Sequence, residues 1–212
     1  MLLPSRLKIE VLRLLGHHVS RRCHIGMSWL NVDHISMSDG ARIGLLNFFK
    51  GLRSLEMGPE AEIVRFNIFT AYGPFADIGG SQYGRVVLER RAAVTMRHYF
   101  DCQSSVTIGE DSVIGGIGTV FFTHQKGVGV LNEAKPIRIG PRVYLGAACV
   151  VLPGTMVRGR AYVSGGSIVS GVLNEENVLY ASPRATVVKS LPEDAAYFAS
   201  HHPTAHIDEP QG

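Results

Sequence analysis

Aliphatic side chains recur at every sixth position between Ile139 and Leu173. The six positions of this register are Ile139, Leu145, Val151, Val157, Val163 and Val169. Four residues after each of them comes a small or apolar residue, in turn Val143, Cys149, Thr155, Ala161, Ser167 and Leu173. A period of six fits neither an α-helix, which repeats about every 3.6 residues, nor a plain strand, which alternates. The period is typical of a parallel β-helix, in which each hexad forms one short strand and three hexads close one coil.

In such a coil the aliphatic residue of each hexad points inward and stacks on its equivalents in the coils above and below. The small residue fits the narrow corner between two strands. Glycines ease these corners because they adopt conformations that other residues avoid; examples are Gly140, Gly146, Gly159 and Gly165. We therefore predict an all-β fold with one repeat domain over residues 24–173, since each coil packs only on its neighbours.

Two segments depart from the period. The glycine-rich segment from Tyr72 to Gly84 is irregular and predicts a loop or a distorted coil. The second and clearer interruption lies between His124 and Pro136, after which the hexads resume at Ile139. A repeat that stops and resumes in this way has extruded a loop, here residues 125–136. Loops of this length in compact domains usually serve a function.

The first sixteen residues are expected to form a short helix from Leu3 to Leu15, ended by Gly16. An apolar face made by Leu3, Leu7, Val11 and Leu14 or Leu15 predicts that the helix covers the open end of the coils, as repeat arrays require. The alternative is an interfacial helix that touches a membrane, and we favour the cap over lipid contact.

Charge and cysteine content narrow the function classes. The formal net charge is +3, and no run of Lys and Arg is long enough for a nucleic-acid site. The three cysteines have no metal-ligand spacing, which is typical of buried, reduced thiols and of a cytoplasmic protein. No apolar run approaches a membrane span, and no signal-peptide pattern is present. Residues 174–212 read as a C-terminal segment with a polar tail.

Three features together resemble the hexapeptide-repeat acyltransferases. A coil ends in a histidine over Val120–His124, and an extruded loop follows it. A block of the form P-I-x-I-G-x-x-V-[WY]-[IL]-G comes next, over Pro136–Gly146, and an x-x-P segment follows the last coil, at Ala181–Arg184. The closest likeness is to the galactoside, maltose and xenobiotic acetyltransferases and to the sugar O-acetyltransferases of surface-polysaccharide synthesis.

The resemblance implies a left-handed β-helix, a homotrimer with its sites between subunits, and acetyl-CoA as acyl donor. It implies that His124 is the general base, since an imidazole removes a hydroxyl proton well near neutral pH. It also implies that the backbone N–H of Gly165 binds the oxyanion. Further residues on the acetyl-CoA side are Tyr144, Gly146, Ala147, Ser164 and Arg184. Ala147 stands where related enzymes often have serine, and Gly171 where they have a basic residue.

The acceptor side is harder to read. His98, Asp101 and Asn67 are candidates to bind a sugar hydroxyl, because His98 and Asp101 come one coil before the base. The same base and donor would also serve N-acetylation of an amino sugar or another small acceptor, and a non-catalytic scaffold stays open. A zinc hydratase is disfavoured, because only His98 and His124 lie in the central coils and such a site needs three imidazoles. We expect no metal.

Overall fold

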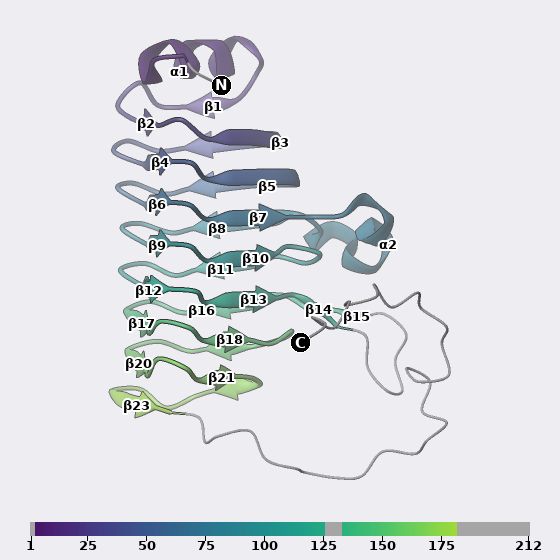
Figure 1. Cartoon of the computed structure of the whole chain (residues 1–212), viewed down its shortest axis with the longest axis vertical. Coiled ribbons are helices and arrows are strands. Elements are labelled where there is room, and N and C mark those ends of the chain that lie inside the picture. The colour runs from purple at the N-terminus through teal and green to yellow at the C-terminus, as the bar shows by residue number, and fades with distance from the viewer. Residues whose placement is uncertain (1–2, 126–132, 182–212) are drawn as a thin grey trace, which may run out of the picture.

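The computed structural model describes residues 3–125 and 133–181, which form a parallel β-helix with a short helix at its N-terminal end (Figure 1). The coils stack in chain order, and parallel strands on three sides pair with their equivalents in the next coil. The helix is α1 (Ser5–Leu14). The predicted parallel β-helix is confirmed.

Within each coil the chain visits three faces in turn, from the first to the third. The first face consists of β2 (His24–Ile25), β4 (Arg42–Leu45), β6 (Glu62–Arg65), β9 (Ala93–Met96), β12 (Val113–Ile117), β17 (Val143–Leu145), β20 (Ala161–Val163) and β23 (Val178–Tyr180). The second face consists of β7 (Ile68–Thr70), β10 (Tyr99–Asp101), β13 (Val120–Phe122), β18 (Val150–Val151) and β21 (Ile168–Val169). The third face consists of β1 (His18–Val19), β8 (Arg85–Leu88), β11 (Val106–Ile108), β16 (Ile137–Ile139), β19 (Met156–Val157) and β22 (Val172–Leu173). The long strands β3 (Trp29–Met37) and β5 (Phe48–Met57) run from the second face into the third.

The hexad register sets the pairing between coils. Ile139 pairs with Val157, which is three hexads further along the chain, and both side chains are buried. Leu145 pairs in the same way with Val163, and Val151 with Val169. The solenoid also extends past the predicted boundary at Leu173, because β23 pairs with β20.

A column of four phenylalanine rings fills the centre of the second face. Phe49, Phe69, Phe100 and Phe121 are fully buried, and successive ring centroids lie 4.8, 4.3 and 4.5 Å apart. Each ring belongs to the next coil, so the column ties four coils together through apolar burial and ring stacking. Asp101 and Phe122 follow Phe100 and Phe121 on the same strands, so the column supports the end of the second face that precedes His124.

A ladder of buried polar side chains runs along the corner between the first and second faces. Its members are Ser28, Asn47, Asn67, His98, Thr119 and Cys149. Each of the first five accepts a hydrogen bond from the backbone N–H of the next member, at 3.0 to 3.3 Å. The ladder satisfies backbone groups that the turn would otherwise leave unpaired inside the protein.

This ladder corrects the expectation that Asn67 and His98 face an acceptor. The exposed fraction is 0% for Asn67 and 1% for His98, so neither side chain reaches solvent. His98 accepts the Thr119 N–H at Nδ1 over 3.1 Å, so its proton sits on Nε2, which lies 2.9 Å from the Thr95 hydroxyl. Both residues hold neighbouring coils together.

His98 makes the stability of the fold sensitive to acid. Burial lowers its pKa to about 4 from an ordinary value near 6.5. Because the folded state holds the imidazole neutral, the unfolded chain binds a proton first as the pH falls below 6.5. The free energy of unfolding should therefore fall between pH 6.5 and pH 4, by about 3 kcal/mol from this residue. Urea unfolding at a series of pH values measures the loss.

The matched variant is His98→Asn, because Asn67 already fills the equivalent ladder position with an amide. Its carbonyl oxygen can accept the Thr119 N–H without a titratable group. The variant should fold and should lose the part of the acid sensitivity that His98 supplies. An unchanged pH profile in His98→Asn would contradict this assignment.

Helix α1 covers the N-terminal end of the coils, but with a different side from the predicted one. Its buried residues are Lys8, Ile9 and Leu12. Leu7 is 48% exposed and Leu14 is 86% exposed, so the predicted apolar face points away from the coils. Both sides of the helix carry apolar residues, and the inner side gains the further contact of Lys8 Nζ with the Gly26 carbonyl at 2.6 Å.

Candidate active site at the His124 corner

Both irregular segments of the sequence leave the solenoid at the corner between the second and third faces. The first forms three short turns, η1 (Gly73–Phe75), α2 (Ala76–Gly79) and η2 (Gly80–Gln82). The second begins and ends in a two-residue antiparallel ladder, in which β14 (His124–Gln125) pairs with β15 (Glu133–Ala134). The two segments project on the same side of the molecule, and α2 contacts β15 (Figure 1). Residues 126–132 of the predicted loop lie outside the described residues.

His124 stands where the chain leaves β13, and Asp101 of the preceding coil holds it. The Asp101 Oδ2 atom accepts hydrogen bonds from the backbone N–H groups of Thr123 at 3.0 Å and His124 at 3.1 Å. The same oxygen lies 2.7 Å from His124 Nδ1. Because a carboxylate only accepts, Nδ1 must carry the proton, and the lone pair of a neutral imidazole is then on Nε2.

Asp101 therefore has a different role from the predicted one. We expected its carboxylate to bind the acceptor, but its side chain is 4% exposed and is occupied by Thr123 and His124. The His124 side chain, by contrast, is 31% exposed. A buried carboxylate that orients a solvent-accessible imidazole is the usual arrangement of a catalytic base.

The first irregular segment places an aromatic ring over the imidazole. The rings of Phe75 and His124 have centroids 5.3 Å apart and stack at 30°. Tyr72, which is 59% exposed, lies next to Phe75 with ring centroids 5.8 Å apart. The segment is anchored by the buried Gln103, whose side-chain oxygen accepts the Tyr72 N–H at 3.1 Å. Sequence reasoning missed Phe75, because it flagged the segment from Tyr72 to Gly84 only as an irregularity.

A basic cavity lies around the corner on the third face. It has a volume of about 290 Å³, and its lining includes Gln82, Lys135 and Arg138. Lys135 follows the His124–Ala134 pair directly, and its backbone N–H donates to the Thr123 carbonyl at 2.8 Å. The cavity therefore borders the base of the loop and offers two cationic side chains, of which Lys135 already pairs with Glu133 at 2.7 Å.

The residues predicted to contact acetyl-CoA form a second group, at the corner between the first and second faces. Tyr144 projects from β17 and stacks on Tyr162 at 4.8 Å between ring centroids. Gly146 and Gly165 follow β17 and β20 and are in close contact, since a side chain on Gly146 would meet the Gly165 nitrogen at 2.5 Å. Ala147 and Ser164 lie at the same corner, and Arg184 lies outside the described residues.

This second group does not meet His124 within one chain, because the second face separates the two corners. Gly165 is exposed, and its backbone N–H has no hydrogen-bond acceptor among the residues that the structure describes. A site that used both His124 and Gly165 would need a second copy of the chain.

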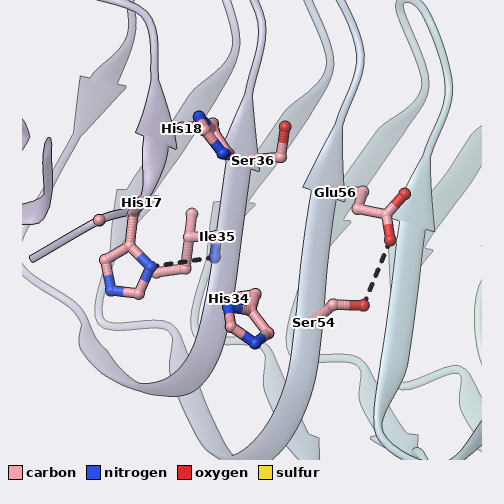
Figure 2. Close-up of a pocket in the computed structure, with 8 residues that line it drawn as sticks. His17, His18, His34, Ile35, Ser36, Ser54 and Glu56 are labelled. Carbon is pink, nitrogen blue, oxygen red and sulfur yellow. Dashed lines mark hydrogen bonds between the residues drawn. The ribbon is translucent and has the colours of Figure 1, made fainter.

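A third group of polar residues lies on the third face near the N-terminal end (Figure 2). His17, His18 and His34 line a cavity of about 340 Å³ together with Ser36, Ser54 and Glu56. His17 Nδ1 accepts the Ile35 N–H at 3.2 Å, and burial, followed by the nearby His34 and His18, lowers the pKa of His17. Within residues 3–125 and 133–181, no group of three or more His, Cys, Asp or Glu side chains could hold a metal ion. Among the described residues, none of these three histidines has a hydrogen bond to a carboxylate like the one that orients His124, and Glu56 pairs with Ser54 and Arg85 instead.

No family model matches the chain, and no curated protein matches it. Among the described residues, no helix is both long and apolar enough to cross a membrane. The His124–Asp101 pair is therefore the observation on which a function has to be built.

Proposed function

We propose that the protein is an acetyl-CoA-dependent O-acetyltransferase that acetylates a sugar hydroxyl, with His124 as general base. The observation that carries the proposal is the 2.7 Å contact between Asp101 Oδ2 and His124 Nδ1. The imidazole of His124 is half-buried and lies at the base of the loop. The resemblance to sugar acetyltransferases supports the same assignment through the order of histidine, loop and hexad block.

The proposed step needs a base, a thioester and an oxyanion donor. Nε2 of His124 takes the proton of the acceptor hydroxyl as its oxygen attacks the thioester carbonyl carbon. The tetrahedral intermediate then collapses, the carbon–sulfur bond breaks, and the CoA thiolate leaves and takes up the proton from Nε2. The acceptor gains an ester bond, and no oxidant or metal is required.

Asp101 has two tasks in this scheme. It keeps the Nδ1–H tautomer, so that the free lone pair of His124 is the one that faces the acceptor. Its negative charge also stabilises the imidazolium that forms in the transition state. Phe75 limits the movement of the ring, and Phe75 and Tyr72 offer apolar ring surfaces to the carbon face of a sugar.

The oxyanion donor in the proposal is the backbone N–H of Gly165 from a neighbouring copy. It is exposed and unpaired within the described residues, and it lies on a corner that His124 of the same chain does not share. The proposed assembly is a homotrimer with acetyl-CoA held between copies by the group around Tyr144. Light scattering that gave a mass of 23.0 kDa at micromolar concentration would contradict this assembly.

Acetyl-CoA binding is the first test. A ligand that binds only the native state at one hundred times its Kd stabilises it by about 2.7 kcal/mol. For a domain of this size, the stabilisation corresponds to a rise in Tm of about 5 to 10 °C. Differential scanning fluorimetry with CoA should show the rise, and pantetheine, which lacks the nucleotide, should give a smaller one. The absence of any shift at millimolar CoA would favour a non-catalytic scaffold.

A further inference from the structure

Helix α1 has two apolar sides, and only one of them is used inside the protein. The inner side packs Ile9 and Leu12 on the coils, with exposed fractions of 2% and 8%. The outer side presents Leu7, Leu14 and Leu15, which are 48%, 86% and 70% exposed. Leu7 and the inner Leu12 are five positions apart, which is about 140° around an α-helix of 3.6 residues per turn, so the two sides are distinct faces of one helix rather than one broad stripe.

The outer side is also the terminal surface of the molecule. Figure 1 shows α1 across the N-terminal end of the solenoid, with the coils on one side of it only. The exposed leucines therefore do not face another described coil. They form a small apolar surface at the tip of an elongated protein.

Positive charge is concentrated at the same end. Residues 1–24 contain five basic side chains and one acidic one, which gives a charge of +4, so that residues 25–212 carry the remaining −1 of the total of +3. Lys8 is buried against the Gly26 carbonyl and does not face solvent. The exposed members are Arg6, Arg13, Arg21 and Arg22. The pairs that Arg21 makes with Glu10 and Arg22 makes with Asp39 lie at the surface, where ion pairs are weak and can be exchanged.

We propose that the outer side of α1 docks the protein on an anionic lipid bilayer. The exposed leucines would enter the boundary between headgroups and acyl chains, and the arginines would contact lipid phosphates. A helix of ten residues is about 15 Å long, half the hydrocarbon thickness, so the contact is peripheral and lies in the membrane plane. This inference is independent of the proposed acetyl transfer.

The positive charge of this end favours a bilayer over a second copy of the chain as the partner of the outer side of α1. Two copies that met through this surface would bring two regions of charge +4 together, and like charges repel at such a contact. An anionic bilayer complements the same charge. Apolar burial and electrostatic attraction together form the pair of signals that peripheral anchoring requires.

The test is co-sedimentation of the full chain with vesicles. We expect binding to vesicles of phosphatidylcholine and phosphatidylglycerol, weaker binding to phosphatidylcholine alone, and release as salt is raised. The Leu7→Gln/Leu14→Gln variant should lose binding by about tenfold or more. Its matched control is Leu179→Gln, since Leu179 is 66% exposed on β23 at the other end of the solenoid.

The charge arm uses Arg21→Gln/Arg22→Gln, with Arg90→Gln/Arg91→Gln as a control that removes the same charge elsewhere. The first pair should weaken vesicle binding by about tenfold, and the control should not. Circular dichroism confirms that each variant is folded. The proposal is overturned if the wild type does not bind anionic vesicles. It is also overturned if Leu7→Gln/Leu14→Gln binds them as well as the control Leu179→Gln does. A self-association seen by light scattering that Leu7→Gln/Leu14→Gln abolishes, without vesicle binding, would instead assign the surface to a second copy.

Discussion

His124→Ala should lower the rate of acetyl transfer by about a hundredfold to ten-thousandfold, which is the usual cost of removing a general base. The loss should appear in kcat, since the imidazole acts on the proton of the acceptor and is distant from the group around Tyr144 within the chain. CoA binding, measured by fluorimetry, should stay unchanged. The variant should also fold, because the His124 side chain is partly exposed and Asp101 keeps its backbone hydrogen bonds.

Asp101→Asn removes the charge of Asp101 and keeps its shape. A single oxygen, Oδ2, accepts from the Thr123 N–H, the His124 N–H and Nδ1, so the amide oxygen of asparagine should take its place and the NH₂ group should point away. The Nδ1–H tautomer is then kept, which nitrogen NMR of labelled histidine would show, and the variant loses the charge that stabilises the imidazolium. We therefore expect a smaller loss of kcat than for His124→Ala, with little change in KM. A turnover near that of the wild type in His124→Ala would mean that the base is elsewhere, and an Nε2–H tautomer in Asp101→Asn would contradict the assigned contact.

Phe100→Ala should destabilise the fold by about 3 to 5 kcal/mol, because it removes a fully buried ring from the middle of the phenylalanine column. The substitution leaves a cavity between Phe69 and Phe121, and both rings lose their stacking partner. The control is Phe122→Ala on the neighbouring strand, since its ring is 37% exposed. Urea unfolding should give a much smaller loss for the control, and equal losses would contradict the stacked column as a main source of stability.

The hexad pattern was sufficient to predict the architecture, because an aliphatic residue at every sixth position fits neither the period of an α-helix nor the alternation of a plain strand. Ile139, Leu145 and Val151 each pair with the predicted partner in the next coil. The inner face of α1 was predicted wrongly, since apolar residues lie on both sides of this helix. Periodicity identifies an apolar stripe, but it does not say which of two stripes meets the core.

The polar ladder explains why Asn67 and His98 were wrongly predicted to bind the acceptor. Asn67 and His98 occupy corner positions at which the C-terminal coils have small residues such as Cys149 and Ser167. A polar side chain at a corner can face solvent or pair with the backbone, and only the structure shows that these two pair inward. Burial of the corner is a property of the stacked coils and is absent from any one hexad.

His124 could be located from the sequence because a repeat was interrupted beside it. Asp101 was noticed for its chemistry, but its contact with His124 depends on stacking β10 against β13, which brings residues of different coils together. Phe75 left no periodic signal, because it lies in the irregular segment between β7 and β8. Residues that come from insertions reach a site through packing that a repeat pattern does not describe.

The central claim, that the His124 corner transfers acetyl groups, is tested most directly by a mass-spectrometric screen. The protein would be incubated with acetyl-CoA and a panel of nucleotide sugars and lipid-linked sugars, beside His124→Ala as the matched control. The account predicts an acceptor whose mass rises by one acetyl group, with release of CoA, in the wild type and not in the variant. Acetylation at equal rates by both proteins would contradict it, as would the absence of CoA release with every acceptor.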